Sequence, residues 1–303
     1  MENKNAMICD LETGVCGAEG EDAVTEIDLN PPKKTIDLYY VTDPICSHCW
    51  ALEPVLRRFT EQYGDYFHFH TVMGGLLEKW SDDPVDPGNG ISKPSDVAGH
   101  WREVGEHSRM PIDGSVWLDN PLHSSFPPSR VYKVIQKRHS DKKAAQFLRR
   151  AREALFVFNE NIAQTPVMVR IVNELGLDGE TIVAEAEEQT GHQLLAEDFQ
   201  LAARLGVRGF PTIVMINEQK KGVKVVGARA LQHYVDALKH VLGEEELQPK
   251  QQPPLSELLQ KEKLLFAKEI EVMYDVEPQD LQRFIAEQLG HSGFEVKEIL
   301  GEK

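Results

Sequence analysis

The sequence has few cysteines, and none of them lies after residue 49. Cys9, Cys16, Cys46 and Cys49 all fall in the first sixth of the 303-residue chain. A disulfide framework would distribute its cysteines so as to join distant segments, and a chain of this length can bury a core without one. The clustering therefore indicates local chemistry rather than a disulfide scaffold.

Long hydrophobic runs are also missing. No apolar run approaches the roughly 18 residues that a membrane-spanning helix needs. The N-terminus, MENKNAMICDLETGVCGAEG, is polar and acidic, and it lacks the basic and apolar regions of a signal peptide. We therefore expect a cytoplasmic protein with no membrane-spanning segment.

The chain also has no excess of basic residues, since its formal net charge is −16. Residues 1–30 hold eight acidic residues against one basic residue, and residues 244–303 hold fourteen against seven. The middle of the chain is nearly neutral. This distribution argues against nucleic-acid binding. Acidic ends are more typical of solubility or of contact with a protein partner.

The predicted elements follow the order β-α-β, then a helical block, then α-β-β-α. Hydrophobic periodicity predicts strands at residues 35–43, 66–75, 210–217 and 222–228, and helices at about 50–64 and 231–243. The stretch between the second and third strands is mostly helical. Within it, residues 81–99 have the composition of a loop, and one helix is expected to begin after Pro127 and Pro128.

This order predicts four regions. They are a flexible acidic N-terminal segment (1–35), a globular α/β domain (36–243) with a helical insertion at about 76–190, a linker (244–255) and a separate small helical module (256–303). Apolar residues of the last module, Leu264 to Phe266, have two interpretations, because they could bind a partner or pack on the body. Its acidic charge argues against a DNA-binding helix-turn-helix.

The stretch ICSHCW places Cys46 and Cys49 two residues apart, where a predicted strand turns into a predicted helix. Such pairs occur in zinc sites, structural disulfides and dithiol redox centres. A structural zinc site needs four ligands, and only the two early cysteines could complete a sulfur set. At a helix N-terminus, free N–H groups and the helix dipole favour a thiolate. We expect a dithiol centre in which Cys46 attacks, Cys49 resolves the mixed disulfide and His48 tunes the thiolate.

The CSHC motif, the helix with Glu53 behind it and the distant GFPT (209–212) together resemble the thioredoxin superfamily, and more closely its DsbA and FrnE-like branch. The fold implied is thioredoxin-like with an inserted helical domain. The resemblance implies that Glu53 relays protons beneath the dithiol. It also implies that Pro211 is cis and that Phe210 and Pro211 hold a substrate strand. We group Trp50 with them as a substrate contact, although packing explains it as simply.

A second resemblance covers nearly the whole chain. The stretches DPICSHCWALEPV (43–55), GSVW (114–117), EALFVFNENI and PPL…FAKEIEVMYDV are similar to the SpxH family of bacilli, DsbA-like adaptors that present the regulator Spx to the ClpXP protease. Its C-terminal part is specific, because plain DsbA proteins end at the helix expected at 231–243.

Two functions from different classes follow from these resemblances. The first is a DsbA-type thiol-disulfide oxidoreductase acting on protein or small-molecule disulfides. The second is an SpxH-like adaptor with Spx and ClpXP as partners. Neither function requires a cofactor or a metal.

Three further features each have two interpretations. Cys9 and Cys16 are expected to lie in a disordered or purely structural tail, and the alternative is a second redox pair or a metal-linked hairpin. His68 and His70 lie on one strand face, where an ordinary hydrogen-bonded pair is favoured over a metal site. The basic stretch from Arg130 to Arg152 fits solvated helix faces, or a surface that docks an acidic tail or partner.

Overall fold

The computed structural model describes residues 8–9, 16–17, 36–81, 84–290 and 294–299, and it divides the chain into two compact units, residues 1–33 and 34–303. In the first unit, β1 (Ile8–Cys9) pairs antiparallel with β2 (Cys16–Gly17), and Cys9 lies opposite Cys16 in the ladder. The side chains of these residues lie outside what the structure describes. The predictions for the two cysteines and for the segment 1–35 therefore stay predictions.

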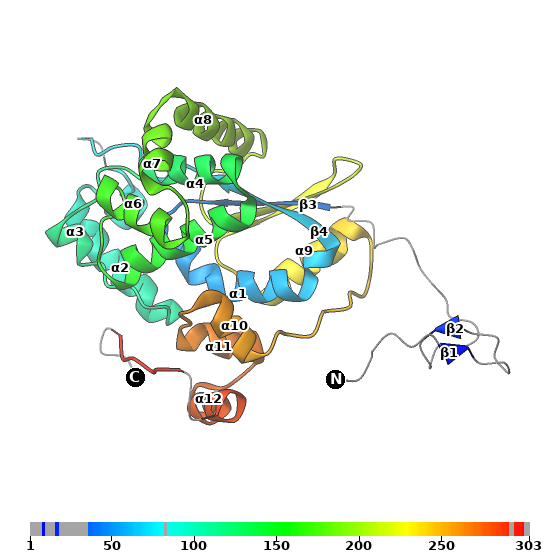
Figure 1. Ribbon diagram of the computed structural model, residues 1–303. Helices are drawn as coiled ribbons and strands as arrows, with labels where there is room; N and C mark the ends of the chain where they lie inside the picture. The colour runs from blue at the N-terminus through cyan, green and yellow to red at the C-terminus, as the bar shows by residue number, and fades with distance from the viewer. Residues whose placement is uncertain (1–7, 10–15, 18–35, 82–83, 291–293, 300–303) are drawn as a thin grey trace. The chain divides into compact units, whose positions relative to one another are not determined.

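The second unit is built around a four-stranded mixed sheet in the order β4-β3-β5-β6 (Figure 1). Its strands are β3 (Ile36–Thr42), β4 (Phe67–Met73), β5 (Thr212–Asn217) and β6 (Gly222–Val226). β3 runs parallel to β4 and antiparallel to β5, which pairs antiparallel with β6. Helix α1 (Ser47–Tyr63) makes the crossover that a parallel pair requires. The predicted strands and the thioredoxin-like fold class are confirmed.

The helical insertion lies between β4 and β5. Its helices are α2 (Pro94–Ser108), α3 (Val116–Asp119), α4 (Phe126–Arg138), α5 (Asp141–Arg152), the π-helix η3 (Glu153–Val157), α6 (Thr165–Glu174), α7 (Gly179–Glu187) and α8 (Gln189–Arg204). Short 3-10 turns, η1 (Gly64–Tyr66) and η2 (Pro87–Asn89), follow α1 and β4. Within the described ranges, no helix has both the length and the apolar character to cross a bilayer.

Two helices of the insertion begin earlier than predicted. α2 starts at Pro94, inside the expected loop, and α4 starts at Phe126, before its two prolines. Proline fits the first turn of a helix, because the N–H that it lacks would have no partner there. At α2, Asp96 also accepts hydrogen bonds from the N–H groups of Ser92 and Lys93, both at 3.1 Å.

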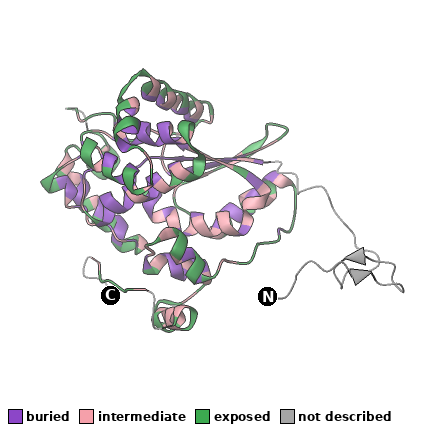
Figure 2. Ribbon diagram, viewed as in Figure 1, coloured by how far each residue is buried: buried purple, intermediate pink, exposed green. Residues whose placement is uncertain are grey.

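Two hydrophobic clusters meet at α1, which packs on both the sheet and the insertion. One cluster joins α1 and the closing helix α9 (Leu231–Leu242) to the sheet, with Phe59 among its buried residues. The other fills the insertion and includes Trp50, from the first turn of α1. In Figure 2, α1 is coloured mostly as buried and intermediate. The N-terminal end of α1 is therefore held rigidly between the two parts of the domain.

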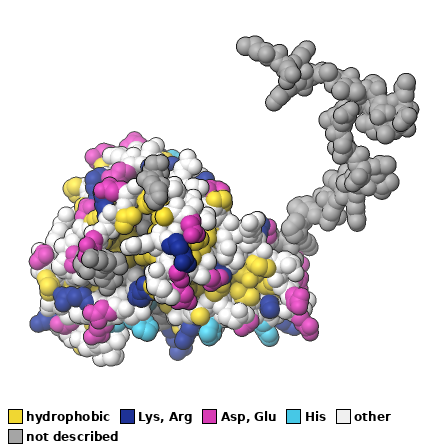
Figure 3. All heavy atoms as spheres, turned by 90° about the horizontal axis from the view of Figure 1, so that it is seen from below, with side chains coloured by type: hydrophobic (Ala, Val, Ile, Leu, Met, Phe, Trp, Pro, Cys, Tyr) yellow, Lys and Arg dark blue, Asp and Glu magenta, His cyan; other side chains and the backbone are white. Residues whose placement is uncertain are grey.

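The C-terminal helices follow α9. They are α10 (Leu255–Glu262), α11 (Ala267–Tyr274), the 3-10 turn η4 (Pro278–Asp280) and α12 (Leu281–Leu289). α11 packs along α1 (Figure 1), and the ring of Phe266 lies 5.5 Å from that of Trp50. The structure thus differs from the expected separate module, since α10 and α11 belong to the same compact unit as the domain. Figure 3 views the molecule from below the view of Figure 1, and it shows acidic, basic and hydrophobic side chains intermixed on that face.

Candidate functional site

The two cysteines lie at the turn from β3 into α1. Cys46 is the N-cap of α1, and its Sγ accepts a hydrogen bond from the N–H of Cys49 at 3.3 Å. Both are free thiols, and both are buried, with 4% of Cys46 and none of Cys49 exposed. The pair therefore sits at the helix N-terminus that the sequence predicts, but it is enclosed rather than open to solvent.

Asp43 fixes the loop that carries the dithiol. Its carboxylate is fully buried and accepts hydrogen bonds from the N–H of Ile45 (3.0 Å), the N–H of Leu76 (2.7 Å) and the Oγ of Ser125 (2.8 Å). Burial raises the pKa of Asp43 to about 6, although these hydrogen bonds oppose the change. Sequence reasoning did not single it out. Its place directly after a strand and before the CxxC motif is the signal that could have found it.

Glu53 has a partner that the sequence did not reveal. Arg152, the last residue of α5, is fully buried and donates to Glu53 Oε1. It also donates to Thr42 Oγ1 at 2.6 Å and to the Asp43 carbonyl at 3.1 Å. The carboxylate expected to relay protons therefore faces a fixed cation beneath the dithiol.

The two thiols have opposite pKa changes. Burial raises the pKa of Cys46, and its hydrogen bond to Cys49, with the nearby charges of Cys49 and Asp43, raises it further. Burial also raises the pKa of Cys49, but the hydrogen bond from Cys46, the charge of Arg152 and the hydrogen bond with Thr42 lower it below its ordinary value. Asp43, Arg152 and Thr42 thus act on the pKa values of the pair, and the attack by Cys46 stays a prediction.

His48 lies next to a second histidine. Its ring lies beside that of His100 on α2, with 5.6 Å between the ring centres. Partial burial lowers the pKa of His48, and the charges of His100 and His107 lower it further. The neutral imidazole is therefore favoured, and tuning of the thiolate by His48 stays a prediction.

Phe210 and Pro211 lie at the same end of the sheet as the dithiol. The peptide bond between them is cis. Thr212 pairs with Val41, so the register brings Pro211 to the end of β3. Phe210 lies directly over Gly74, where an added Cβ would come within 2.0 Å of the ring. The first glycine of GGLLEKW is therefore required by the position of Phe210.

Trp50 is a core residue. It is fully buried, and its Nε1 donates to the Pro111 carbonyl at 3.0 Å. Its ring stacks on Phe156 at 5.7 Å, and the guanidinium of Arg149 lies over it at 5.0 Å. Trp50 is therefore not placed to contact a substrate as expected, because no face of its ring is accessible.

The basic stretch from Arg130 to Arg152 docks the acidic C-terminal segment. Arg149 forms two hydrogen bonds to Glu269 of α11, at 2.6 and 2.9 Å, and Arg150 donates to the Glu262 carbonyl. Other members pair within the body, as Lys133 does with Asp198 at 2.7 Å. The alternative of an acidic segment docked on this stretch is thus realised within the chain itself.

Of the two alternating histidines, His70 has a carboxylate partner. His70 binds Asp37 at 3.0 Å and stacks on Tyr39. In the part of the chain that the structure describes, no group of three or more His, Cys, Asp or Glu residues is arranged to hold a metal ion.

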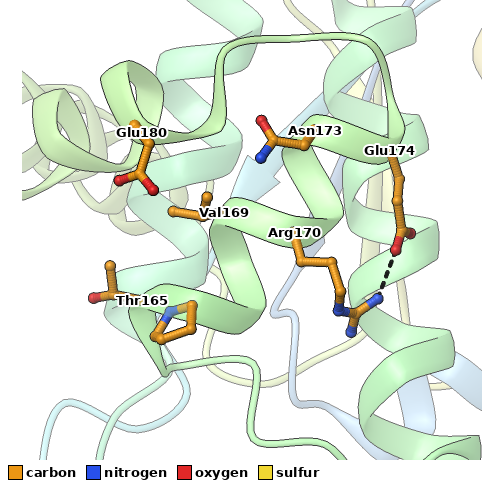
Figure 4. A pocket seen from close by; sticks show the side chains of 7 residues that line it. Thr165, Val169, Arg170, Asn173, Glu174 and Glu180 are labelled. Atoms are coloured by element: carbon orange, nitrogen blue, oxygen red, sulfur yellow. Dashed lines mark hydrogen bonds and ion pairs between the residues drawn. The ribbon is translucent and has the colours of Figure 1, made fainter.

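A cavity of about 610 Å³ lies at α6 and α7, and none of its lining residues belongs to the dithiol region (Figure 4). Several of its polar side chains already have partners. Arg170 pairs with Glu174 at 2.8 Å, and the Asn173 Oδ1 accepts from the N–H of Gly179 at 2.9 Å. These groups are already partnered, so the cavity offers little for a ligand to bind.

Comparison with known proteins identifies the fold and the relatives of the chain. Residues 39–236 match the family model described as Thioredoxin. The chain is 29% identical over 287 residues to the ClpXP adapter protein SpxH of Halalkalibacterium halodurans, a match that covers 93% of this chain and 90% of that protein. It is 30% identical to SpxH of Bacillus subtilis, covering 83% of this chain and 82% of that protein.

Solved structures share the fold over a smaller part of the chain. A putative protein disulfide isomerase from Nitrosomonas europaea is 21% identical with a TM-score of 0.56, covering 69% of this chain and 96% of that one. The cytosolic disulfide reductase DsbM from Pseudomonas aeruginosa is 22% identical with a TM-score of 0.51, covering 68% and 97%. Both likenesses are to the thioredoxin-like fold with its helical insertion.

Proposed function

Since the chain belongs to the thioredoxin family and to the family of SpxH adapter proteins, we propose that it is a cytoplasmic adaptor that binds an Spx-like regulator and presents it to the ClpXP protease. The observation that carries this proposal is the extent of the similarity. An SpxH relative matches 93% of the chain, whereas the two disulfide enzymes match 68% and 69%. What the chain has in common with the adapters therefore extends well beyond the shared fold.

The packing of the C-terminal helices supports this proposal. Glu269 of α11 binds Arg149 of α5 at 2.6 Å and Arg57 of α1 at 3.3 Å, and Arg57 also binds Glu262 of α10 at 2.6 Å. These pairs join the part of the chain outside the thioredoxin match to the helix that begins at the dithiol. A partner that contacts α10 and α11 would thus meet a surface fixed to the thioredoxin domain.

The test is the degradation of purified Spx by ClpXP and ATP, with and without the full chain. We expect the full chain to accelerate degradation of Spx, and to leave an unrelated ClpXP substrate unchanged. A variant with Cys46→Ser and Cys49→Ser should still accelerate it, because the proposed adaptor function needs a docking surface rather than thiol chemistry. The adaptor proposal fails if wild-type protein has no effect on Spx.

The buried dithiol supports a second function, thiol-disulfide exchange. In this reaction the reduced pair meets a disulfide RSSR, a sulfur of the pair displaces one RS⁻, and the other sulfur resolves the mixed disulfide. The products are the Cys46–Cys49 disulfide and two RSH, so the pair is oxidised and RSSR is reduced. Because only 4% of Cys46 is exposed, we expect this exchange to need a local opening and to be slow.

Exchange is measured by mass spectrometry after incubation of the reduced full chain with oxidised glutathione. We expect the intramolecular disulfide to form in wild-type protein, and only a mixed disulfide or no product in Cys46→Ser. Ser47→Ala is the matched control, because it keeps both sulfurs. A wild-type rate no greater than that of a free thiol contradicts an enzymatic function for the pair.

A further inference from the structure

Trp50 connects the dithiol to the rest of the protein. It directly follows Cys49 in the first turn of α1, and its N–H donates to the Cys46 carbonyl at 3.1 Å. In the same turn, the N–H of Cys49 donates to Cys46 Sγ. Because both thiols are buried, a reagent reaches them only when the structure around them opens locally. An opening that moves the first turn must also displace Trp50, so the contacts that hold Trp50 oppose it.

The segment that follows α10 supplies one wall of the Trp50 site. Phe266, the N-cap of α11, is only 6% exposed, and its ring meets that of Trp50 edge-on, with 5.5 Å between the centres and 77° between the planes. The guanidinium of Arg149 lies over both rings, 5.0 Å from the centre of Trp50 and 5.4 Å from that of Phe266. Edge-to-face and cation–π contacts are both favourable beyond the area that they bury. Phe266 therefore holds Trp50 directly and shares a cation with it.

Arg149 is itself held by α11. Its two terminal nitrogens donate to Glu269 at 2.6 and 2.9 Å, and its Nε donates to Glu153 of η3 at 2.6 Å. Glu269 also accepts a hydrogen bond from the N–H of Phe266 at 3.0 Å. Undocking α11 would thus remove Phe266 from Trp50 and leave Arg149 with a single carboxylate.

The loop that accepts the Trp50 N–H is also tied to α11. Trp50 Nε1 donates to the Pro111 carbonyl at 3.0 Å. Two residues earlier, Arg109 donates to both carboxylate oxygens of Glu271, at 2.7 and 2.8 Å, and Glu271 is buried. A second pair, separate from that of Glu269 with Arg149, therefore joins α11 to the surroundings of Trp50.

We propose that docked α11 restrains the dithiol, because the opening that exposes Cys46 requires Trp50 to part from Phe266. A partner that draws α11 away from α1 would expose the thiols, and a partner that holds α11 in place would keep them closed. The inference rests on the second proposed function, thiol-disulfide exchange, for which this opening is needed. It assigns the control of that exchange to a helix outside the thioredoxin match, which ends at residue 236.

The measurement is the rate of alkylation by iodoacetamide of the reduced full chain carrying Cys9→Ser and Cys16→Ser. The sulfur displaces iodide and gains one carbamidomethyl group, which mass spectrometry of the peptides assigns to Cys46 or Cys49. Alkylation reports the opening without any disulfide exchange. If wild-type protein does not exchange with oxidised glutathione, the second proposed function fails, while the alkylation rates still decide whether α11 restrains the thiols.

We expect Phe266→Ala to speed the alkylation of Cys46 by at least about tenfold, because the lost packing on Trp50 lowers the free energy of opening. Phe266→Leu should act in the same direction by a smaller factor. Phe67→Ala is the matched control. It also removes a buried ring, but Phe67 pairs with Ile36, at the end of β3 distant from the dithiol. Its rate should stay within about twofold of wild type, since distant sites act independently.

Glu271→Gln tests the same restraint if neither variant at position 266 folds, as judged by circular dichroism. It weakens the pair with Arg109 and leaves the contacts of Trp50 in place, so it should also speed alkylation, by less than Phe266→Ala. The proposal is overturned if the folded variants of Phe266, or Glu271→Gln in their place, react no faster than wild type. It is also overturned if Phe67→Ala accelerates alkylation as much as Phe266→Ala, because global unfolding would then expose the thiols.

Discussion

α11 and α12 are neighbours in the chain and nearly equal in length, yet only α11 is anchored in the body. α11 buries Glu269, Ile270, Glu271 and Met273, whereas α12 buries none of its nine residues (Figure 2). The difference does not lie in hydrophobic patterning, since both helices are amphipathic. It lies in charge, because Glu269 meets the buried Arg149 and Glu271 meets Arg109. An acidic helix is thus fixed to the core by fully paired charges, and its neighbour stays at the surface.

The largest expected effect comes from breaking the buried pairing of α11. Glu269→Ala would leave Arg149 and Arg57 without the carboxylate they share. Removing one partner of a buried ion pair destabilises by about 3–5 kcal/mol. Because Arg149 keeps Glu153 and Arg57 keeps Glu262, we expect a loss at the lower end of this range. Chemical denaturation of the purified chain measures the loss. A loss below about 1 kcal/mol would show that the pairing does not anchor α11.

Acid pH should remove the charge of Glu269 without a change of side-chain length. Burial raises the pKa of Glu269, but Arg149 and its hydrogen bonds, with Arg57, lower it below the ordinary value of 4.5. A carboxyl whose folded-state pKa is lowered stabilises the fold above its unfolded pKa, and this stability is lost as the pH falls through the folded pKa.

The stability difference between wild type and Glu269→Gln should therefore be greatest at neutral pH. Below about pH 4.5 it should shrink, because wild type then becomes protonated as well. The measurement is a series of denaturation curves between pH 3 and 7 for the two proteins. If the stability difference between the two proteins stays constant over this range, the stabilisation does not come from the charge of Glu269.

Removing α12 should cost much less than disturbing α11. Truncation after Asp275 deletes a helix whose apolar residues are only half-buried, so we expect a loss of at most about 2 kcal/mol. Truncation after Glu262, which also removes Phe266 and α11, should be far more destabilising because it uncovers Trp50. Thermal unfolding of the two truncated chains measures the contrast, and equal losses would remove the distinction between the helices.

The smallest effect is expected at the exposed ion pair of α12. Arg283 and Glu287 are 3.9 Å apart, and both are more than half exposed. Solvent and salt screen such a pair, so Glu287→Ala should change stability by less than about 0.5 kcal/mol. It is the matched control for Glu269→Ala, since the same substitution is made on a neighbouring helix. A change as large as that of Glu269→Ala would mean that burial does not decide the effect.

The sequence predicted the sheet and the dithiol turn because both depend on local patterns. Alternating residues mark β3 and β4, and the CxxC motif lies at their crossover helix. It did not predict the helix boundaries at Pro94 and Phe126. At both places the prolines suggest a loop by composition, but they lie in the first turn of a helix. The packing of the surrounding chain decides between these two conformations.

The partners of the site could not be predicted, because they come from segments distant in sequence. Arg152 is about a hundred residues from Glu53, and in sequence it is one of nine basic residues in an amphipathic stretch. Periodicity cannot distinguish a basic residue on a solvated face from one buried against the core. Arg152 and Asp43 both act on the pKa values of the two thiols, and the CxxC motif alone reveals neither of these neighbours.

The π-helix η3 explains how one continuous helical run serves two neighbours. α5 ends with Arg152 directed to the dithiol, and four residues later Phe156 stacks on Trp50. The hydrogen bond from the N–H of Phe158 to the Glu153 carbonyl spans five residues, one more than in an α-helix. Deleting one residue from 153–157 would restore the α-helical count and rotate everything after it by about 100°. The extra residue therefore contributes a rotation of the chain that follows it. A sequence comparison would show this residue only as an insertion.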